Sequence, residues 1–111
     1  MKREYNLYLN DIKDCIRQIE EYLKNISEDE FNKNKLLQDA VIRRFEIMGE
    51  ATRNIPRALK EKNKHVPWFN MEQFRDFITH GYFELSINRV WKAYKDDLPI
   101  VKKAMEKITF V

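Results

Sequence analysis

The sequence predicts an all-α protein, an antiparallel bundle of four or five helices. Apolar residues recur at intervals of three and four along most of the chain, which is the spacing of one helix face. The 111 residues include only two glycines and three prolines, too few for the hairpins and tight turns of an all-β fold. Because one small subunit can bury little apolar area, we also expect a homodimer.

The first helix is predicted from Tyr5 to Ile26. Its apolar face contains ten residues at helical spacing: Tyr5, Tyr8, Leu9, Ile12, Cys15, Ile16, Ile19, Tyr22, Leu23 and Ile26. Cys15 lies within this face, so a buried, inert thiol is favoured over a nucleophile, which would need a base beside it. A single cysteine forms no disulfide within the chain, which fits a reducing cytoplasm.

A capping box predicts the start of the second helix, because Ser27 is followed three residues later by Glu30. We expect this helix to reach Pro56, with an apolar face that includes Leu36, Leu37, Ala40, Val41, Phe45, Met48, Ala51 and Ile55. Gly49 interrupts the pattern. A glycine inside a helix costs about 1 kcal/mol relative to alanine, which suggests that another helix passes close by. Glu50, the next residue, either faces solvent or directs its carboxylate into a functional cleft.

Shorter helices are predicted for the remainder of the chain. Residues 56–68 are polar and lysine-rich, which is typical of a loop with at most one helical turn. A third helix then begins near Trp68, and Gly81 is placed where a left-handed residue would end it. Its buried residues are predicted to be Met71, Phe74, Phe77 and Ile78.

Ser86 is predicted to cap a fourth helix, and a final short helix follows Pro99. The inward residues of the fourth helix are Ile87, Val90, Trp91 and Tyr94, and the apolar residues of the last are Ile100, Val101, Ala104, Met105 and Ile108. The chain contains no internal repeat or low-complexity linker. Residues 1–111 are therefore expected to form a single helical domain.

Composition and motifs disfavour most classes of enzyme. The formal net charge of +3 permits a nucleic-acid partner without requiring one. No window has the length and apolar character of a signal peptide or a membrane span, so we expect a cytoplasmic protein with no membrane segment. His65 and His80 belong to different elements, and neither a cysteine pair nor a glycine-rich phosphate loop is present. We expect no metal and no cofactor.

The stretch RDFITHGYF, residues 75–83, is the exception. On a straight helix Arg75 and His80 point about 140° apart, whereas Arg75 and Tyr82 share a face. A helix that ends near His80 would let the chain turn His80 and Tyr82 toward Arg75. Asp76, four residues before His80, could then accept a hydrogen bond from its ring. The pattern leaves two interpretations open: a polar helix terminus, or a functional site.

Three segments resemble the HEPN superfamily in the form of HepT-like toxins. RDFITHGY has the family's arginine, histidine and tyrosine spacing, and DAVIRRFEIMGEATRNIP resembles its second-helix segment with Gly-Glu-Ala. The segment VPWFNMEQFRDFITHGYFELSINRVWKAYKDDLPIV resembles the remainder, with Pro-Trp before the motif and a tryptophan after it. Asp76 stands where family members often carry asparagine. The resemblance covers nearly the whole chain.

The resemblance implies a homodimeric helical bundle that acts as a metal-independent ribonuclease toxin. It implies that Arg75 and His80 are the catalytic pair. Asp76 and Glu50, from their positions in the sequence, are the candidates for supporting residues. The implied partner is a minimal nucleotidyltransferase antitoxin of the MntA type, which would add AMP to Tyr82 and could form a larger toxin–antitoxin assembly. An alternative is a non-catalytic HEPN module that binds a nucleotidyltransferase and a nucleotide or RNA. A purely structural dimer is a third possibility.

Overall fold

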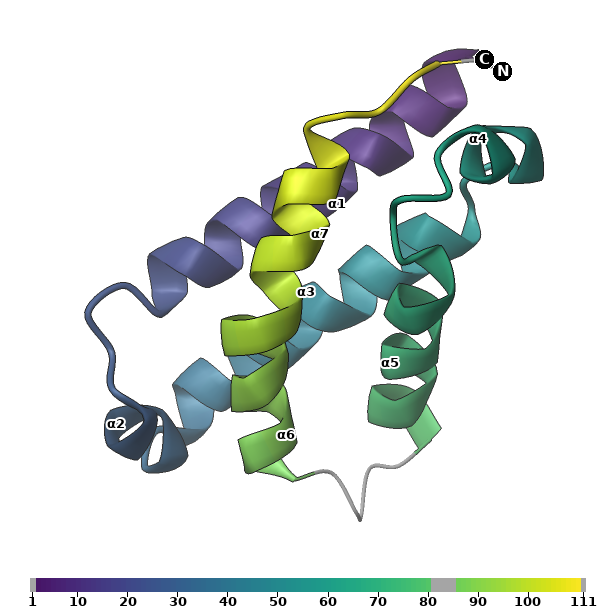
Figure 1. Cartoon of the computed structure of the whole chain (residues 1–111). Helices are drawn as coiled ribbons and strands as arrows, with labels where there is room; N and C mark the ends of the chain where they lie inside the picture. The colour runs from purple at the N-terminus through teal and green to yellow at the C-terminus, as the bar shows by residue number, and fades with distance from the viewer. Residues whose placement is uncertain (1, 81–85, 111) are drawn as a thin grey trace.

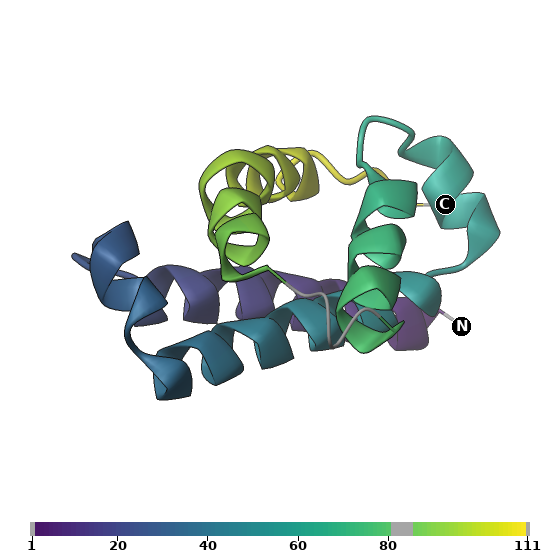
Figure 2. The same cartoon turned by 90° about the horizontal axis from the view of Figure 1, so that it is seen from below.

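The computed structural model describes residues 2–80 and 86–110, with side chains for residues 5–79 and 86–110. Every regular element within these residues is helical, which confirms the all-α class. Helices α1 (Lys2–Tyr22) and α3 (Lys35–Arg53) run antiparallel as one layer (Figure 1). Helix α5 (Trp68–His80) and the helical run that ends in α7 (Leu98–Met105) cover one face of this pair (Figure 2).

Helix α3 is at the centre of the fold, with α1 along one side and α5 along another. Ile12 and Ile19 of α1 and Val41 of α3 are fully buried. Full burial of such a side chain contributes about 1.5–3 kcal/mol, so the α1–α3 pair supplies much of the core's stability. The predicted first helix is confirmed but ends earlier, at Tyr22. Asn25 has a φ of 61°, a left-handed conformation that a right-handed helix cannot continue.

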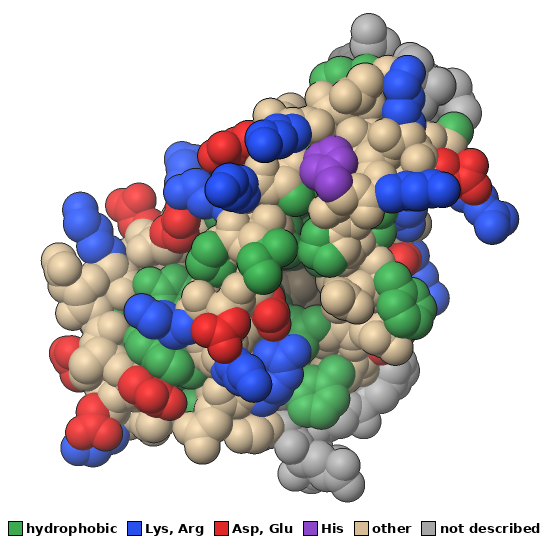
Figure 3. Space-filling view, viewed as in Figure 1, with side chains coloured by type: hydrophobic (Ala, Val, Ile, Leu, Met, Phe, Trp, Pro, Cys, Tyr) green, Lys and Arg blue, Asp and Glu red, His purple; other side chains and the backbone are tan. Residues whose placement is uncertain are grey.

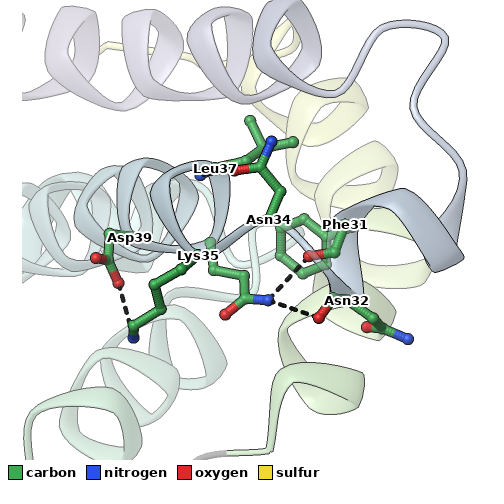
Figure 4. Close-up of polar contacts among 7 residues, drawn as sticks. Phe31, Asn32, Asn34, Lys35, Leu37 and Asp39 are labelled. Carbon is green, nitrogen blue, oxygen red and sulfur yellow. Dashed lines mark hydrogen bonds and ion pairs between the residues drawn. The ribbon is translucent and has the colours of Figure 1, made fainter.

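The predicted second helix is wrong at its start, because the structure forms two helices there. The capping box is confirmed: the Ser27 hydroxyl accepts from the Glu30 backbone N–H at 3.1 Å, and the Glu30 carboxylate accepts from the Ser27 N–H at 3.0 Å. This box begins α2 (Glu28–Asn32), which is only five residues long. A second cap at Asn34 then begins α3, where the Asn34 side chain accepts from the Leu37 N–H (Figure 4).

The side chain of Gln38 closes the junction between α2 and α3. Its amide donates to the carbonyl oxygens of Phe31 at 2.9 Å and Asn32 at 3.2 Å. Figure 4 marks both hydrogen bonds with dashed lines that reach the carbonyl oxygens of Phe31 and Asn32. Carbonyls at the end of a helix lack partners within it. Gln38 provides a donor to Asn32 O and a second donor to Phe31 O, which also accepts from the Asn34 N–H at 3.2 Å. Phe31, fully buried, anchors α2 to the core.

Residues 56–68 contain more structure than predicted, since α4 (Arg57–Lys62) occupies their first half. The second half is organised by Asn63, whose side chain is fully buried. Its amide donates to Leu59 O at 2.9 Å and Thr109 O at 2.7 Å, while its oxygen accepts from the Thr109 N–H at 2.7 Å. The Trp68 indole N–H donates to the Asn63 carbonyl at 3.0 Å. The side chain and the backbone carbonyl of one buried residue, Asn63, therefore join α4, α5 and the segment after α7.

The predicted break before Pro99 is wrong, because residues 87–105 form one helical run. It consists of α6 (Ile87–Lys92), a π-helical segment η2 (Ala93–Asp97) and α7. Ser86 is the N-cap of α6 as predicted, although its side chain makes no capping hydrogen bond. The Leu98 N–H donates to Ala93 O, five residues back. This wider turn accommodates the ring of Pro99, which would clash with a carbonyl four residues before it in a regular α-helix.

Three residues predicted on apolar faces are instead exposed: Leu36 (83%), Phe77 (40%) and Ile100 (59%). Each is adjacent to an apolar residue that faces the core, namely Leu37, Ile78 or Val101. Neighbouring residues on a helix point about 100° apart, so only one of each pair can face inward. Among the described residues, none of the helices combines the length and the apolar character that a bilayer crossing requires.

Candidate functional site

The site is built where α3 and α5 cross at Gly49. A Cβ added to Gly49 would overlap the Cβ of Arg75 and lie 2.7 Å from its Cγ and 3.3 Å from the Met71 carbonyl oxygen. Ordinary carbon–carbon contacts are about 3.5–4.0 Å, so only glycine allows the two helices to approach this closely. The close approach predicted from the sequence is confirmed. It places Cβ and Cγ of Arg75 directly against the α3 backbone at Gly49.

The guanidinium of Arg75 is held by two carboxylates. Its Nη2 lies 3.0 Å from Oε2 of Glu50, and its Nη1 lies 3.2 Å from Oδ1 of Asp76. The arginine side chain is only 22% exposed, whereas the carboxylates of Glu50 and Asp76 are 53% and 56% exposed. The carboxylate of Glu50 therefore faces solvent and contacts Arg75 at the same time.

These ion pairs orient Arg75 without binding it strongly. Exposed ion pairs contribute about 0–1 kcal/mol, because water screens them. A guanidinium has five N–H donors, and the two pairs occupy one nitrogen each. A phosphate that offers bidentate geometry could therefore exchange with a carboxylate at modest cost.

His80 is the last residue of α5, and its backbone continues the helix from Asp76. Asp76 and His80 are thus separated by one regular helical turn. The predicted hydrogen bond between their side chains requires the helix to extend this far. That bond stays a prediction, since the His80 side chain is outside the described part of the structure, and the described bond of Asp76 is to Arg75. Gly81 and Tyr82 also lie outside the described residues.

Two cavities flank the crossing of α3 and α5. The smaller, about 340 Å³, is lined by Tyr8 and Asp11 of α1 together with Glu50, Arg75 and Thr79. The larger, about 740 Å³, lies between α3, α5 and the helical run 87–105. Figure 3 shows this face hollowed between α5 and the run, with hydrophobic side chains and charged side chains of both signs around the opening. Asp76 lines the larger cavity while it pairs with Arg75.

The larger cavity is lined by Arg89 and Asp97, which the sequence did not indicate as functional residues. Arg89 lies over the ring of Phe74 at 4.8 Å and its Nη1 is 3.3 Å from Oδ2 of Asp97. Phe74 in turn stacks near Phe77, with ring centroids 6.2 Å apart. The sequence carries no local signal for this group, because α5 and the run 87–105 are brought together only by the tertiary fold.

The described residues contain neither a reactive cysteine nor a cluster of metal ligands. Burial raises the pKa of the Cys15 thiol to about 11, so this thiol is protonated and unreactive near neutral pH, as predicted from its position. Within the described residues, no group of three or more His, Cys, Asp or Glu side chains is arranged to hold a metal ion.

Comparison with known proteins identifies the family. Residues 12–108 match the family model described as "Ribonuclease HepT-like". The chain belongs to the HepT-like ribonuclease family. The resemblance to HepT-like proteins is therefore confirmed, and the family is one of ribonucleases, which act on RNA.

Several HepT-like relatives align along nearly the whole chain. A Thermococcus cleftensis protein named "Probable ribonuclease HepT" is 41% identical over 97% of this chain and 98% of its own length. A Methanocaldococcus jannaschii protein named as a putative RNase is 39% identical over 95% of this chain and 96% of its own. A longer M. jannaschii protein, named as a gamma-glutamylcyclotransferase and putative RNase, is 43% identical over 97% of this chain. The chain spans 49% of that protein's length. No solved structure matches the chain.

Proposed function

We propose that this protein is an endoribonuclease that cleaves RNA without a metal ion, with Arg75 and His80 as its catalytic pair. The proposal rests chiefly on one observation: Arg75 is fixed against Gly49 at the crossing of two helices, with Glu50 orienting its guanidinium. An arginine held in this way is preorganised to stabilise charge that develops on a phosphate. The ribonuclease family supports RNA as the substrate.

The proposed reaction uses the RNA's own 2′-hydroxyl as the nucleophile. His80 removes the proton from the 2′-hydroxyl, and the 2′-oxygen forms a bond to the adjacent phosphorus. Arg75 stabilises the negative charge of the pentacoordinate phosphorane. The bond from phosphorus to the 5′-oxygen then breaks, and an imidazolium donates the proton that this oxygen needs. The products are a 2′,3′-cyclic phosphate and a 5′-hydroxyl.

The reaction needs both a base and an acid, which leads us to propose a homodimer with two RDFITHGYF segments along one cleft. His80 of one protomer would act as the base and His80 of its partner as the acid. Each protomer is proposed to be a single domain over residues 1–111. The mass of the protein in solution, measured by light scattering during size exclusion, tests the dimer, and a monomer at concentrations that cleave RNA would refute it.

We propose further that Tyr82 is the site of inactivation by a minimal nucleotidyltransferase antitoxin in the cytoplasm. AMP on a tyrosine two residues from His80 would add bulk and a negative phosphate where the RNA phosphate must bind. Mass spectrometry after co-expression with the cognate enzyme tests this directly. Neutralised toxicity with no AMP on Tyr82 would instead indicate inhibition by binding alone.

The nuclease assay is performed in excess chelator, with cyclic phosphate ends as the measured product. Arg75→Ala and His80→Ala should each lower the cleavage rate at least 100-fold, while Glu50→Gln should lower it less, because Glu50 only positions Arg75. Glu20→Gln on α1 is the control: the Glu20 carboxylate pairs with Lys102 at 2.9 Å, and the residue lines neither cavity beside the crossing of α3 and α5. Equal cleavage by wild type and His80→Ala would refute the assignment.

One observation favours a second candidate function. Both carboxylates beside Arg75 carry negative charge toward the place that a phosphate would occupy. In a non-catalytic HEPN module that binds a nucleotidyltransferase and a nucleotide or RNA, such a site would bind without cleaving. RNA binding that depends on Arg75, with no cyclic phosphate product at any protein concentration, would support this alternative.

A further inference from the structure

The larger cavity has no assigned role in the proposed cleavage. We propose that it binds one nucleobase of the RNA, next to the phosphate that Arg75 contacts. The inference rests on the proposed function, since it names the part of the substrate that the cavity would recognise. Four features of the described residues support it.

The first feature is size and lining. A cavity of about 740 Å³ falls within the range of roughly 300–1,000 Å³ that is usual for small-molecule sites. Its walls include Phe45, Met48, Met71, Phe74 and Phe77. Phe45 and Phe74 pack edge to face at 5.1 Å, which fixes the Phe74 ring, and Phe77 lies beside it with 40% of its surface exposed. A flat, partly exposed aromatic surface is what a nucleobase stacks on.

The second feature is the polar edge of the cavity. Asn70, Gln73, Asp76, Arg89 and Asp97 all line it. They provide amide, carboxylate and guanidinium groups, and thus both hydrogen-bond donors and acceptors. The edge of a nucleobase presents donors and acceptors side by side and carries no charge. A purely aliphatic ligand could form no hydrogen bond with this polar edge, whereas a base could form several.

The third feature is the position of Asp76. Its carboxylate lines the cavity and also lies 3.2 Å from Nη1 of Arg75. Gly49, against which Arg75 packs, lines the same cavity from the α3 side. Asp76 therefore borders the cavity and also contacts the guanidinium that would bind the phosphate. A nucleotide likewise has its base near its phosphate, with the two joined through one ribose.

The fourth feature is the local structure of the opposite wall. Ala93 and Asp97, the two ends of the π-helical segment, both line the cavity. π-helical turns are rare and occur frequently at functional sites. Arg89, paired with Asp97 and placed over Phe74, provides a planar guanidinium at this wall. Arginine contributes to base binding through the same stacking geometry as aromatic rings.

The test measures binding without cleavage. The protein is labelled with ¹³C at its methionine methyl groups and titrated with each of the four nucleoside 5′-monophosphates and with ribose 5-phosphate. We expect the signals of Met48 and Met71, which line the cavity, to shift, while that of Met105, buried in the core elsewhere, stays unchanged. At least one nucleotide should bind about tenfold more tightly than ribose 5-phosphate, which lacks the base.

Variants of exposed phenylalanines on α5 provide the matched control. Phe77→Ala should weaken nucleotide binding about tenfold and leave ribose 5-phosphate binding unchanged, and Phe77→Tyr should keep the wild-type affinity. Phe69, on the same helix and 66% exposed, does not line the cavity, so Phe69→Ala should have no effect. Equal binding of nucleotides and ribose 5-phosphate, or equal losses in the two alanine variants, would overturn the inference.

Two further outcomes separate this inference from the proposed function. A protein that shows the Met48 and Met71 shifts but cleaves no RNA would retain the base site and refute the nuclease. A protein that cleaves RNA while these two methionines respond to dilution, and not to nucleotides, would refute the base site. In that case the cavity would be covered by a second copy of the chain.

Discussion

The substitution Gly49→Ala tests the account of the helix crossing most directly. In an ordinary helix this change would stabilise the protein by about 1 kcal/mol. Here the added methyl group would overlap Arg75 Cβ and lie 2.7 Å from its Cγ, so the two helices must separate. Overpacking of this kind costs about 1–3 kcal/mol, and the upper end applies because a Cβ cannot rotate away. We expect a net loss of about 2 kcal/mol in the free energy of unfolding, measured by urea denaturation.

A double-mutant cycle identifies the clashing atom. Arg75→Ala retains Cβ, so it should relieve little of the cost of Gly49→Ala. Arg75→Gly removes Cβ and should recover at least about 1 kcal/mol beyond additivity. Stability of Gly49→Ala equal to or above that of wild type would refute the reasoning, and so would strict additivity with Arg75→Gly.

Three other predictions concern the scaffold. Since burial raises the pKa of Cys15 to about 11, the folded state retains a proton that the unfolded chain releases above about pH 8.5. The free energy of unfolding should therefore fall from about pH 9 to 11, by at most about 2–3 kcal/mol, and Cys15→Ala should remove this component in urea titrations. Ser27→Ala breaks the capping box and should cost about 1 kcal/mol by the same measurement. Asn63→Ala removes three side-chain hydrogen bonds, two with the exposed residue Thr109 and one with the buried Leu59 carbonyl, and should cost about 3 kcal/mol, seen as a lower melting temperature.

Local physical rules allowed much of the fold to be predicted. The cost of a glycine inside a helix indicated the close approach at Gly49, and the capping box at Ser27 is present as expected. The predicted continuation of that helix was wrong because α2 ends at Asn32 and a second capping residue, Asn34, starts another helix. Both caps are visible in the sequence, but only the tertiary fold decides which of them starts the long helix.

The three exposed residues that were predicted to face the core, Leu36, Phe77 and Ile100, have one physical explanation. Where two apolar residues are adjacent, as at Phe77 and Ile78, periodicity alone does not decide which one faces the core. Sequence patterns were also insufficient to predict the whole candidate site. The motif indicated Arg75, and a carboxylate at Glu50 was one of two options, but the pairing of Arg89 with Asp97 beside Phe74 depends on packing between distant segments.

The contacts at the two ends of the chain have a consequence for fusion proteins. The ring of Tyr5 stacks against that of Phe110, with centroids 6.3 Å apart, and Asn63 ties Thr109 to the same corner. The beginning of α1 and the segment after α7 thus leave the bundle together, while α5 ends on the opposite side of the molecule (Figure 1). A tag or a second domain attached at either end would emerge beside Tyr5 and Phe110, away from the end of α5. A short peptide joining residues 110 and 5 would allow new ends to be opened at another surface position without disturbing the helices.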